Sequence, residues 1–340
     1  MERKNAGIDL MRCIMATLVM LYHYTYRYYE MFSNAPVSLK TNLEYGGTIG
    51  VAVFFIISAY YSTKSDYTDA RRSIIKKYIR LYPAYLVSIS IIYLVVNIAG
   101  VTPLQVSTKD FFLNILFVAR YVGASLVDGA HWYVYFLFIF YIWHILLSKL
   151  MIKNKYWPYI VWLIISTLTS KSFWTILGLD DIVLVNSKLG ALFTVVFLER
   201  YVSYIVVGVM LYFIVNNIGN KYISIIISII ALIRNVIYIP VYVVFIIGVL
   251  GMVLYLILAN RIKIPNIGVV SWFASISYAF YLIHQNLGYV LFQITNGTTT
   301  SQRIIVFFIA IGLSVLLAYI ISLIECKARL KIEQFVAYKK

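Results

Sequence analysis

Residues 8–26 read IDLMRCIMATLVMLYHYTY, an apolar run that is long enough to cross a bilayer yet carries Asp9, Arg12 and His23. Arg12 and His23 are 11 positions apart. At about 100° and 1.5 Å per residue, both side chains leave one face of a helix roughly 16 Å apart, and Asp9 lies about 40° from His23 on the same face. Ionisable groups at this depth cost on the order of a few kcal/mol unless they face a protein interior or a wet cavity. We therefore expect this helix to contribute to a functional site.

A structural explanation competes with the functional one for two of these residues. Asp9 and Arg12 are close enough to form a buried ion pair that only holds helices together. His23 has no acidic neighbour on its own helical turn, so this alternative explains it less well.

The composition indicates a polytopic membrane protein. The 340 residues are 62% hydrophobic and 12% charged, with a mean hydropathy of +0.86, whereas soluble domains are about half apolar and a quarter charged. The net charge of +16 is explained by Lys and Arg in cytoplasmic loops, so we expect membrane lipid and no nucleic acid as a partner. Cys13 and Cys326 form no disulfide framework or metal-ligand spacing, and we expect no metal.

Apolar runs of about 20 residues predict ten membrane-spanning helices and an all-α helical bundle. With the N-terminus inside, 19 of the 29 Lys and Arg residues fall in cytoplasmic segments, so both termini are expected to be cytoplasmic. Residues 108–128 are left as a surface or re-entrant helix. The predicted spans lie near 8–26, 46–64, 81–100, 130–148, 157–172, 190–215, 222–238, 240–259, 268–293 and 304–325.

The chain is expected to form a single membrane domain over residues 1–340, with no appended soluble domain. Asp9 and Arg12 interrupt the apolar part of what would otherwise resemble a signal peptide, so we expect the first helix to be retained. Between the spans 222–238 and 240–259, Arg234 and Pro240 are expected to supply the turn.

Five motifs, taken in order, carry a resemblance to a known family. They are GIDLMRCIMATLVMLYHY from Gly7, GVAVFFIISAYYSTK from Gly50, KKYIRLYPAYL from Lys76, HWYVYFLFIFYI from His131 and SYAFYLIHQ from Ser277. Together they resemble the acyltransferase 3 family of integral-membrane O-acyltransferases, which modify sugars and other cell-surface acceptors. The family's hallmark is an Arg followed after ten residues by a His in the first helix, and Arg12 with His23 matches it.

The chain departs from the family pattern at two positions. The paired arginines that precede Tyr-Pro in the family correspond here to Lys77 and Arg80, so the first position keeps its charge but loses the planar fork that suits phosphate oxygens. The small glycine that follows the Ser of the second helix is replaced, because Ser58 is followed by Ala59.

Acyl transfer from a thioester to a hydroxyl needs a base and donors for the developing oxyanion. His titrates in the useful range, and we expect His23 to be the base. His284 lies at a similar depth in a helix that runs in the same direction, so it is expected to orient or assist His23, or else to be a packed core residue. His131 and His144 are expected to be structural or interfacial. Direct transfer and an acyl-histidine intermediate are both compatible with these residues.

The donor expected from the resemblance is acetyl-CoA, whose phosphates need cations at the cytoplasmic face. Lys77, Arg80 and Arg12 are the expected contacts, while Arg71, Arg72 and Lys76 are explained by the positive-inside rule alone. The sequence thus predicts a multi-pass protein of the plasma membrane, of bacterial origin. The resemblance implies that it moves acetyl groups to a carbohydrate: a surface polysaccharide or its lipid-linked precursor. The alternative is a transporter or flippase for a polysaccharide intermediate, although no paired, interrupted half-helices support it.

Overall fold

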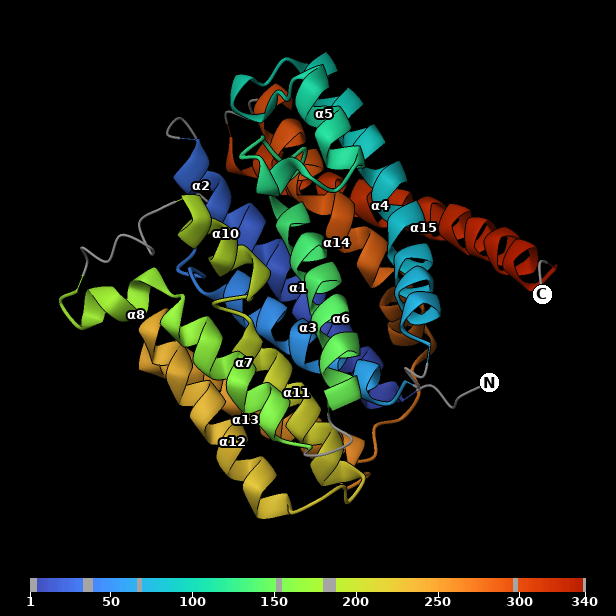
Figure 1. The fold of residues 1–340 in the computed structure, drawn as a ribbon. Helices are drawn as coiled ribbons and strands as arrows, with labels where there is room; N and C mark the ends of the chain where they lie inside the picture. The colour runs from blue at the N-terminus through green and yellow to red at the C-terminus, as the bar shows by residue number, and fades with distance from the viewer. Residues whose placement is uncertain are drawn as a thin grey trace. The chain divides into compact units, whose positions relative to one another are not determined.

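The computed structural model describes residues 5–32, 39–65, 69–150, 155–179, 188–295 and 299–338. Throughout these ranges every regular element is helical, as expected (Figure 1). The 19 Lys and Arg residues expected in cytoplasmic segments include five that lie outside the described residues: Arg3, Lys4, Lys153, Lys339 and Lys340. The helices are α1 (Ala6–Tyr22), α2 (Tyr28–Met31), α3 (Gly46–Thr63), α4 (Ala70–Ala99), α5 (Thr108–Ile115), α6 (Trp132–Leu150), α7 (Trp157–Leu168), α8 (Lys171–Ile176), α10 (Lys188–Val196), α11 (Val202–Val215), α12 (Lys221–Arg234), α13 (Val241–Leu258), α14 (Gly268–Thr295) and α15 (Thr300–Tyr338).

Among the described residues, six helices are long and apolar enough to cross a membrane. They are Ala6–Met31, Gly46–Thr63, Ala70–Ala99, Gly129–Leu150, Val241–Leu258 and Thr300–Lys331. Two shorter apolar helices, α7 and α11, accompany them. α14 is 28 residues long but carries a polar run in its middle. The chain is therefore a helical membrane protein, and the full count of ten spans and the cytoplasmic placement of the termini stay predictions.

Three predicted boundaries differ from the structure. A single helix over 190–215 is wrong: α10 ends at Val196 and α11 begins at Val202, because Leu198 adopts a left-handed backbone with φ 56° and breaks the hydrogen-bond ladder. The first helix is α-helical only to Tyr22, and His23–Arg27 form a π-helical turn, η1. α4 begins at Ala70, so Lys77 and Arg80 lie on a helix rather than in the preceding loop.

Two further expectations can be compared directly with the elements. α12 ends at Arg234, a 3-10 turn follows at Asn235–Ile237, and α13 starts after Pro240, which confirms the predicted turn. α5 has only 8 residues, too short to cross a bilayer.

The chain folds into two compact units, each built from segments that are distant in sequence. Unit 1 consists of Met1–Thr48, Lys76–Tyr135 and Asn266–Lys340, and unit 2 of Ile49–Ile75 and Phe136–Pro265. This division leaves the expectation of a single domain over residues 1–340 as a prediction.

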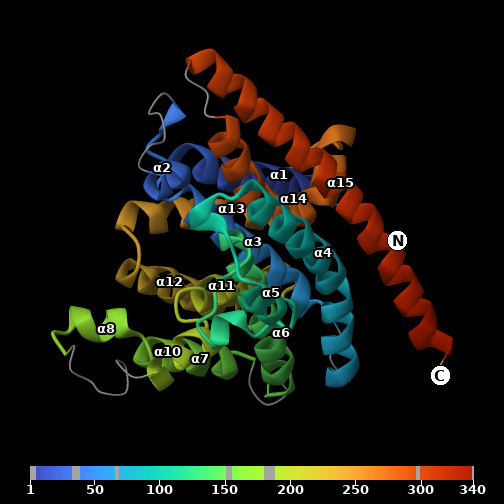
Figure 2. The same ribbon diagram turned by 90° about the horizontal axis from the view of Figure 1, so that it is seen from above.

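Unit 1 is organised around α14, which packs against α1 and α15 and also against η1 and the 3-10 turn η5 (Gly129–His131). Figure 2 shows α15 as one long rod running beside α14 and onward toward the C-terminus. Its 39 residues correspond to about 58 Å of helix. The middle of α14 is consequently enclosed: every residue from Phe280 to Val290 is buried.

Unit 2 is organised around α11, which packs against α12, α7 and α13. Ala59 of α3 is fully buried, and a Cβ added to Gly208 of α11 would lie 2.7 Å from the Ala59 Cβ. The alanine that replaces the family's glycine is therefore matched by a glycine on the facing helix. Arg234 is satisfied by the protein itself, since it donates to Ser166, Thr167, Ser203, Tyr238 and the Glu199 carbonyl.

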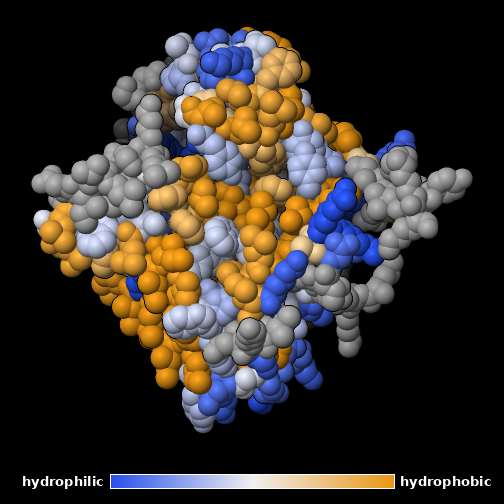
Figure 3. All heavy atoms as spheres, in the orientation of Figure 1, coloured by the Kyte–Doolittle hydropathy of each residue, from blue (hydrophilic) through white to orange (hydrophobic). Residues whose placement is uncertain are grey.

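Apolar side chains are exposed along α12 and α13, as the orange surface over α12 shows (Figure 3). Ile226, Ile230 and Ile233 of α12 are each more than half exposed, and Phe245 of α13 is 71% exposed. A continuous apolar face of this kind is expected where helices meet lipid rather than water.

Candidate active site

The two histidines expected to act together lie side by side in unit 1. His23, the first residue of η1, and His284 of α14 have ring centroids 5.2 Å apart, with the rings inclined at 63°. His23 is partly exposed, whereas His284 is 1% exposed. α1 is regular up to Tyr22, so the spacing that places Arg12 and His23 on one helix face holds. The histidine pair is thus a structural fact, and its role in catalysis stays a prediction.

Tyr289 contacts His23 from the next turn of α14. Its hydroxyl lies 3.2 Å from His23 Nδ1, and its side chain is fully buried. A hydrogen bond at Nδ1 orients the ring and leaves Nε2 as the nitrogen available to a substrate. Tyr289 is therefore the group that holds His23 in place.

The tautomer of neutral His284 follows from its partners. Nδ1 lies 2.9 Å from the carbonyl oxygen of Tyr281 and 3.2 Å from that of Phe280. Carbonyl oxygens only accept hydrogen bonds, so Nδ1 carries the proton and Nε2 carries the lone pair. Nε2 is buried and has no hydrogen-bond partner within the described part of the chain.

A buried tyrosine of η1 crosses close to α14 at the level of His284. The Tyr24 hydroxyl donates to the His284 carbonyl at 2.7 Å and lies 3.3 Å from Ser314 Oγ of α15. A Cβ at Gly288 would lie 2.3–2.5 Å from three atoms of the Tyr24 ring and hydroxyl. Glycine is thus required at position 288 for η1 and α14 to approach each other.

Asp128 and His131 bind the backbone of the same part of α14. The Asp128 carboxylate accepts from the backbone N–H of Ala130 at 2.8 Å and of Asn286 at 2.9 Å. His131 Nε2 lies 2.8 Å from the Leu282 carbonyl oxygen. Burial raises the pKa of Asp128 to about 6, and these two N–H groups oppose the rise by favouring the charged form.

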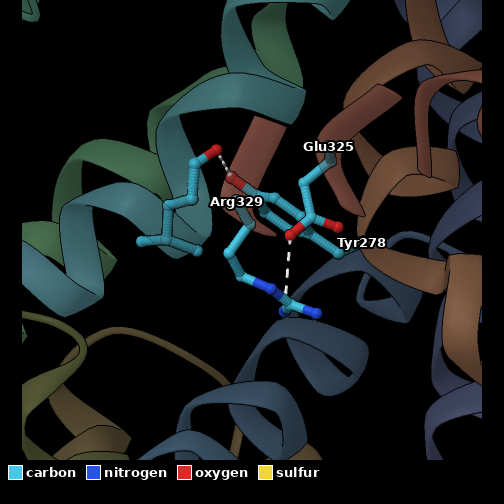
Figure 4. Close-up of polar contacts among 4 residues, drawn as sticks. Tyr278, Glu325 and Arg329 are labelled. Atoms are coloured by element: carbon cyan, nitrogen blue, oxygen red, sulfur yellow. Dashed lines mark hydrogen bonds and ion pairs between the residues drawn. The ribbon is translucent and has the colours of Figure 1, made fainter. Parts of the chain in front are cut away.

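The cationic residues expected to hold the donor meet near the other end of α1. Arg12 is within electrostatic range of Arg80 on α4, and Arg80 is within range of Lys77. α14 supports this end too, since the Tyr278 hydroxyl donates to the carbonyl of Leu81 at 3.1 Å (Figure 4).

An acidic residue and its own cationic partner complete this cluster. Glu325 of α15 lies within electrostatic range of Arg80 and forms an ion pair with Arg329 at 3.5 Å, also drawn in Figure 4. Cations that converge in this way can bind a phosphorylated ligand.

Asp9 is 8% exposed, and its Oδ2 has no hydrogen-bond partner among the residues that the structure describes. Arg12 lies within electrostatic range of it. The structure is therefore compatible with both explanations of Asp9: it forms an ion pair with Arg12 that holds helices together, or it belongs to the site.

The other histidine with an expected structural role is in unit 2. His144 is buried and its Nδ1 lies 2.9 Å from the Tyr159 hydroxyl. It belongs to a different unit from His23 and gives a matched control for the loss of a buried histidine.

Asp128, Tyr289 and Asn286 are among the residues of this site that were not anticipated from the sequence. A signal for one of them exists, because Asn286 ends the polar triplet His284–Gln285–Asn286 inside an otherwise apolar run. Asp128 and Tyr289 gave no comparable signal, since one lies in an ordinary loop and the other is one of 31 tyrosines.

This helical membrane protein thus has a histidine pair at one end of a helix face and a cationic cluster at the other. The profile of the acyltransferase domain family, acyltransferase 3, matches residues 5–323. The chain therefore belongs to this family and is a membrane acyltransferase. No curated protein and no solved structure matches it.

Proposed function

We propose that the protein is an O-acetyltransferase that moves acetyl from cytoplasmic acetyl-CoA to a hydroxyl of a cell-surface polysaccharide or its lipid-linked precursor. The observation that supports it most is the single face of α1, on which Arg12 near Arg80 and His23 near His284 are roughly 16 Å apart. The enzyme is proposed to lie in the plasma membrane of a bacterium, with ten spans and both termini in the cytoplasm.

In this proposal Arg12, Lys77 and Arg80 bind the phosphates of acetyl-CoA, and its pantetheine arm runs along α1. The acceptor oxygen forms a bond to the acetyl carbon and the C–S bond breaks. The hydroxyl proton passes to His23 and then to the thiolate sulfur, so the products are an ester and free CoA. Asp9 is proposed to hold Arg12 in position.

The test is the transfer of labelled acetyl from acetyl-CoA in membranes, with polysaccharide extracted from the same cells as the acceptor. His23→Ala is expected to abolish labelling, and His144→Ala, which removes a buried histidine of unit 2, is expected to retain it. Both proteins must be present in the membrane in amounts equal to wild type.

Two outcomes would contradict the proposal. If wild-type membranes label no acceptor and deletion leaves polysaccharide acetylation unchanged, the acetyl-CoA reaction is wrong. If deletion instead stops polymer export while acetylation of the retained polymer persists, the protein is a transporter of the intermediate.

A further inference from the structure

The segment Val127–His131, here called the clip, contacts both the carbonyl and the N–H group that form one backbone hydrogen bond of α14. In an α-helix the carbonyl of residue 282 pairs with the N–H of residue 286. In this protein His131 Nε2 also lies 2.8 Å from the Leu282 oxygen, and Asp128 also accepts from the Asn286 N–H at 2.9 Å. His284 is midway between these two backbone groups.

Further contacts hold the clip on the same turn. The Tyr281 hydroxyl donates to the Ala130 carbonyl at 2.7 Å, and the Asn286 side chain donates to the Val127 carbonyl at 3.0 Å. A Cβ at Gly129 would lie 2.6 Å from Gln285 Nε2, so the clip approaches α14 too closely for a larger residue. The turn that carries His284 is therefore fixed from outside its own helix.

The clip also determines the electrostatics of His284. Asp128 and His131 are the charged or titratable groups of the clip within electrostatic range of its ring, and His23 faces it from η1. Asp128 is completely buried, so its charge is poorly screened by water. Burial of the ring disfavours a charge on His284, and the Asp128 carboxylate opposes this effect by attracting a positive ring.

We infer that Asp128 is a positioning residue of the histidine pair: it holds the turn of His284 so that the Nε2 lone pair accepts the proton that His23 has taken from the acceptor hydroxyl. In this step the Nε2–H bond of His23 breaks and the Nε2–H bond of His284 forms. His284 keeps its Nδ1 proton and becomes an imidazolium that the Asp128 charge stabilises. The proton returns through His23 to the thiolate. This inference rests on the proposed acetyl transfer.

The kinetic test compares two variants that each remove a clip hydrogen bond. Asp128→Asn keeps the size of the side chain but removes its charge and one acceptor, and Tyr281→Phe removes one neutral hydrogen bond. We expect Asp128→Asn to lower kcat by about tenfold or more with the KM for acetyl-CoA unchanged, and Tyr281→Phe to stay within about twofold of wild type. Equal kcat values for the two variants would show that the clip is only structural.

A second measurement needs no activity and no Asp128 variant. The chain has 4 histidines, so nitrogen NMR of protein labelled with ¹⁵N-histidine reads each tautomer, with His284→Asn and His131→Asn used for assignment. We expect a proton on Nδ1 of His284 and on Nε2 of His131. An Nε2–H tautomer for His284 overturns the inference even in an active enzyme.

The two tests separate this inference from the proposed function. If the tautomers are as expected but wild-type membranes transfer no acetyl group, the proposed function and the proton step fail together while the clip geometry stands. If wild type transfers acetyl and Asp128→Asn does so equally well, only the inference fails.

Discussion

Asp128 places a carboxyl group where no water reaches it, and the cost of this burial depends on pH. Its pKa is raised to about 6 in the folded protein, against an ordinary value of 3.8. Between about pH 4 and 6 the folded state therefore binds more protons than the unfolded state, and the contribution of this residue to stability falls as the pH rises.

This shift makes a prediction for the free energy of unfolding in detergent. The free energy of unfolding of wild type, relative to that of Asp128→Asn, should fall by about 2 kcal/mol between pH 4 and pH 7, because Asn does not titrate. Denaturant unfolding of both proteins at several pH values measures it. If the difference in unfolding free energy between the two proteins stays constant over this pH range, burial does not raise the pKa of Asp128.

A second residue-scale prediction concerns two glycines of neighbouring helices. Gly288→Ala is expected to destabilise unit 1 by about 1–3 kcal/mol, because its Cβ meets Tyr24, whose ring is buried and hydrogen-bonded to the His284 carbonyl. Gly312→Ala in α15 is the control, since nothing lies within 4 Å of its Cβ. It should be neutral or stabilise by up to about 1 kcal/mol.

Thermal unfolding of the two purified variants distinguishes them. Equal melting temperatures would mean that Tyr24 moves aside without cost, and the close approach of η1 to α14 would then not be a constraint.

At the scale of residues, part of the site could be predicted from the sequence. Helical spacing placed Arg12 and His23 on one face, and the structure brings His284 beside His23. The sequence was not sufficient for Asp128 or Tyr289, because each meets α14 or η1 through contacts between residues far apart in the chain. Periodicity within one helix carries no information about such contacts.

At the scale of elements, α4 presents the cations that we assign to the donor. Lys77 is partly buried and lies within electrostatic range of Arg80, whereas Lys76 is exposed. Arg80→Ala is expected to raise the KM for acetyl-CoA about tenfold with little change in kcat, as removal of a charge-assisted phosphate contact should. Lys76→Ala is expected to leave both constants unchanged.

Steady-state kinetics with varied acetyl-CoA measure this difference. Lys77→Arg restores the fork of the family pattern and should lower the KM. A loss of kcat rather than of affinity in Arg80→Ala would place Arg80 in the chemical step.

Hydropathy predicted the positions of most helices but not the changes in backbone conformation within them. Apolar runs located most helices to within a few residues, because lipid-facing and buried helices both need such runs. They did not show the break at Leu198 or the π-helical turn at His23, because both are changes in backbone conformation within segments that remain apolar on average. η1 occurs where a candidate catalytic residue lies, as π-helical turns frequently do.

At the scale of the whole molecule, the orientation in the membrane can be tested with a native residue. Cys326 on α15 is exposed, and it directly follows the span 304–325 predicted from the sequence. In a Cys13→Ser background we expect a membrane-impermeant maleimide to label Cys326 in inverted vesicles and not in intact cells. Labelling from outside would reverse the proposed placement of the C-terminus.

Unit 1 is assembled from three stretches of chain that unit 2 separates in sequence. The partner of η1 in the histidine pair lies on α14, near the end of the chain, so the pair does not exist while the middle of the protein is being made. During synthesis α1 lies in the membrane without the partners of His23, because His284 and Tyr289 are made only with α14. Quality control that recognises exposed polar groups in lipid therefore has a long interval in which to act, and a chain stalled before α14 should be degraded rather than stored.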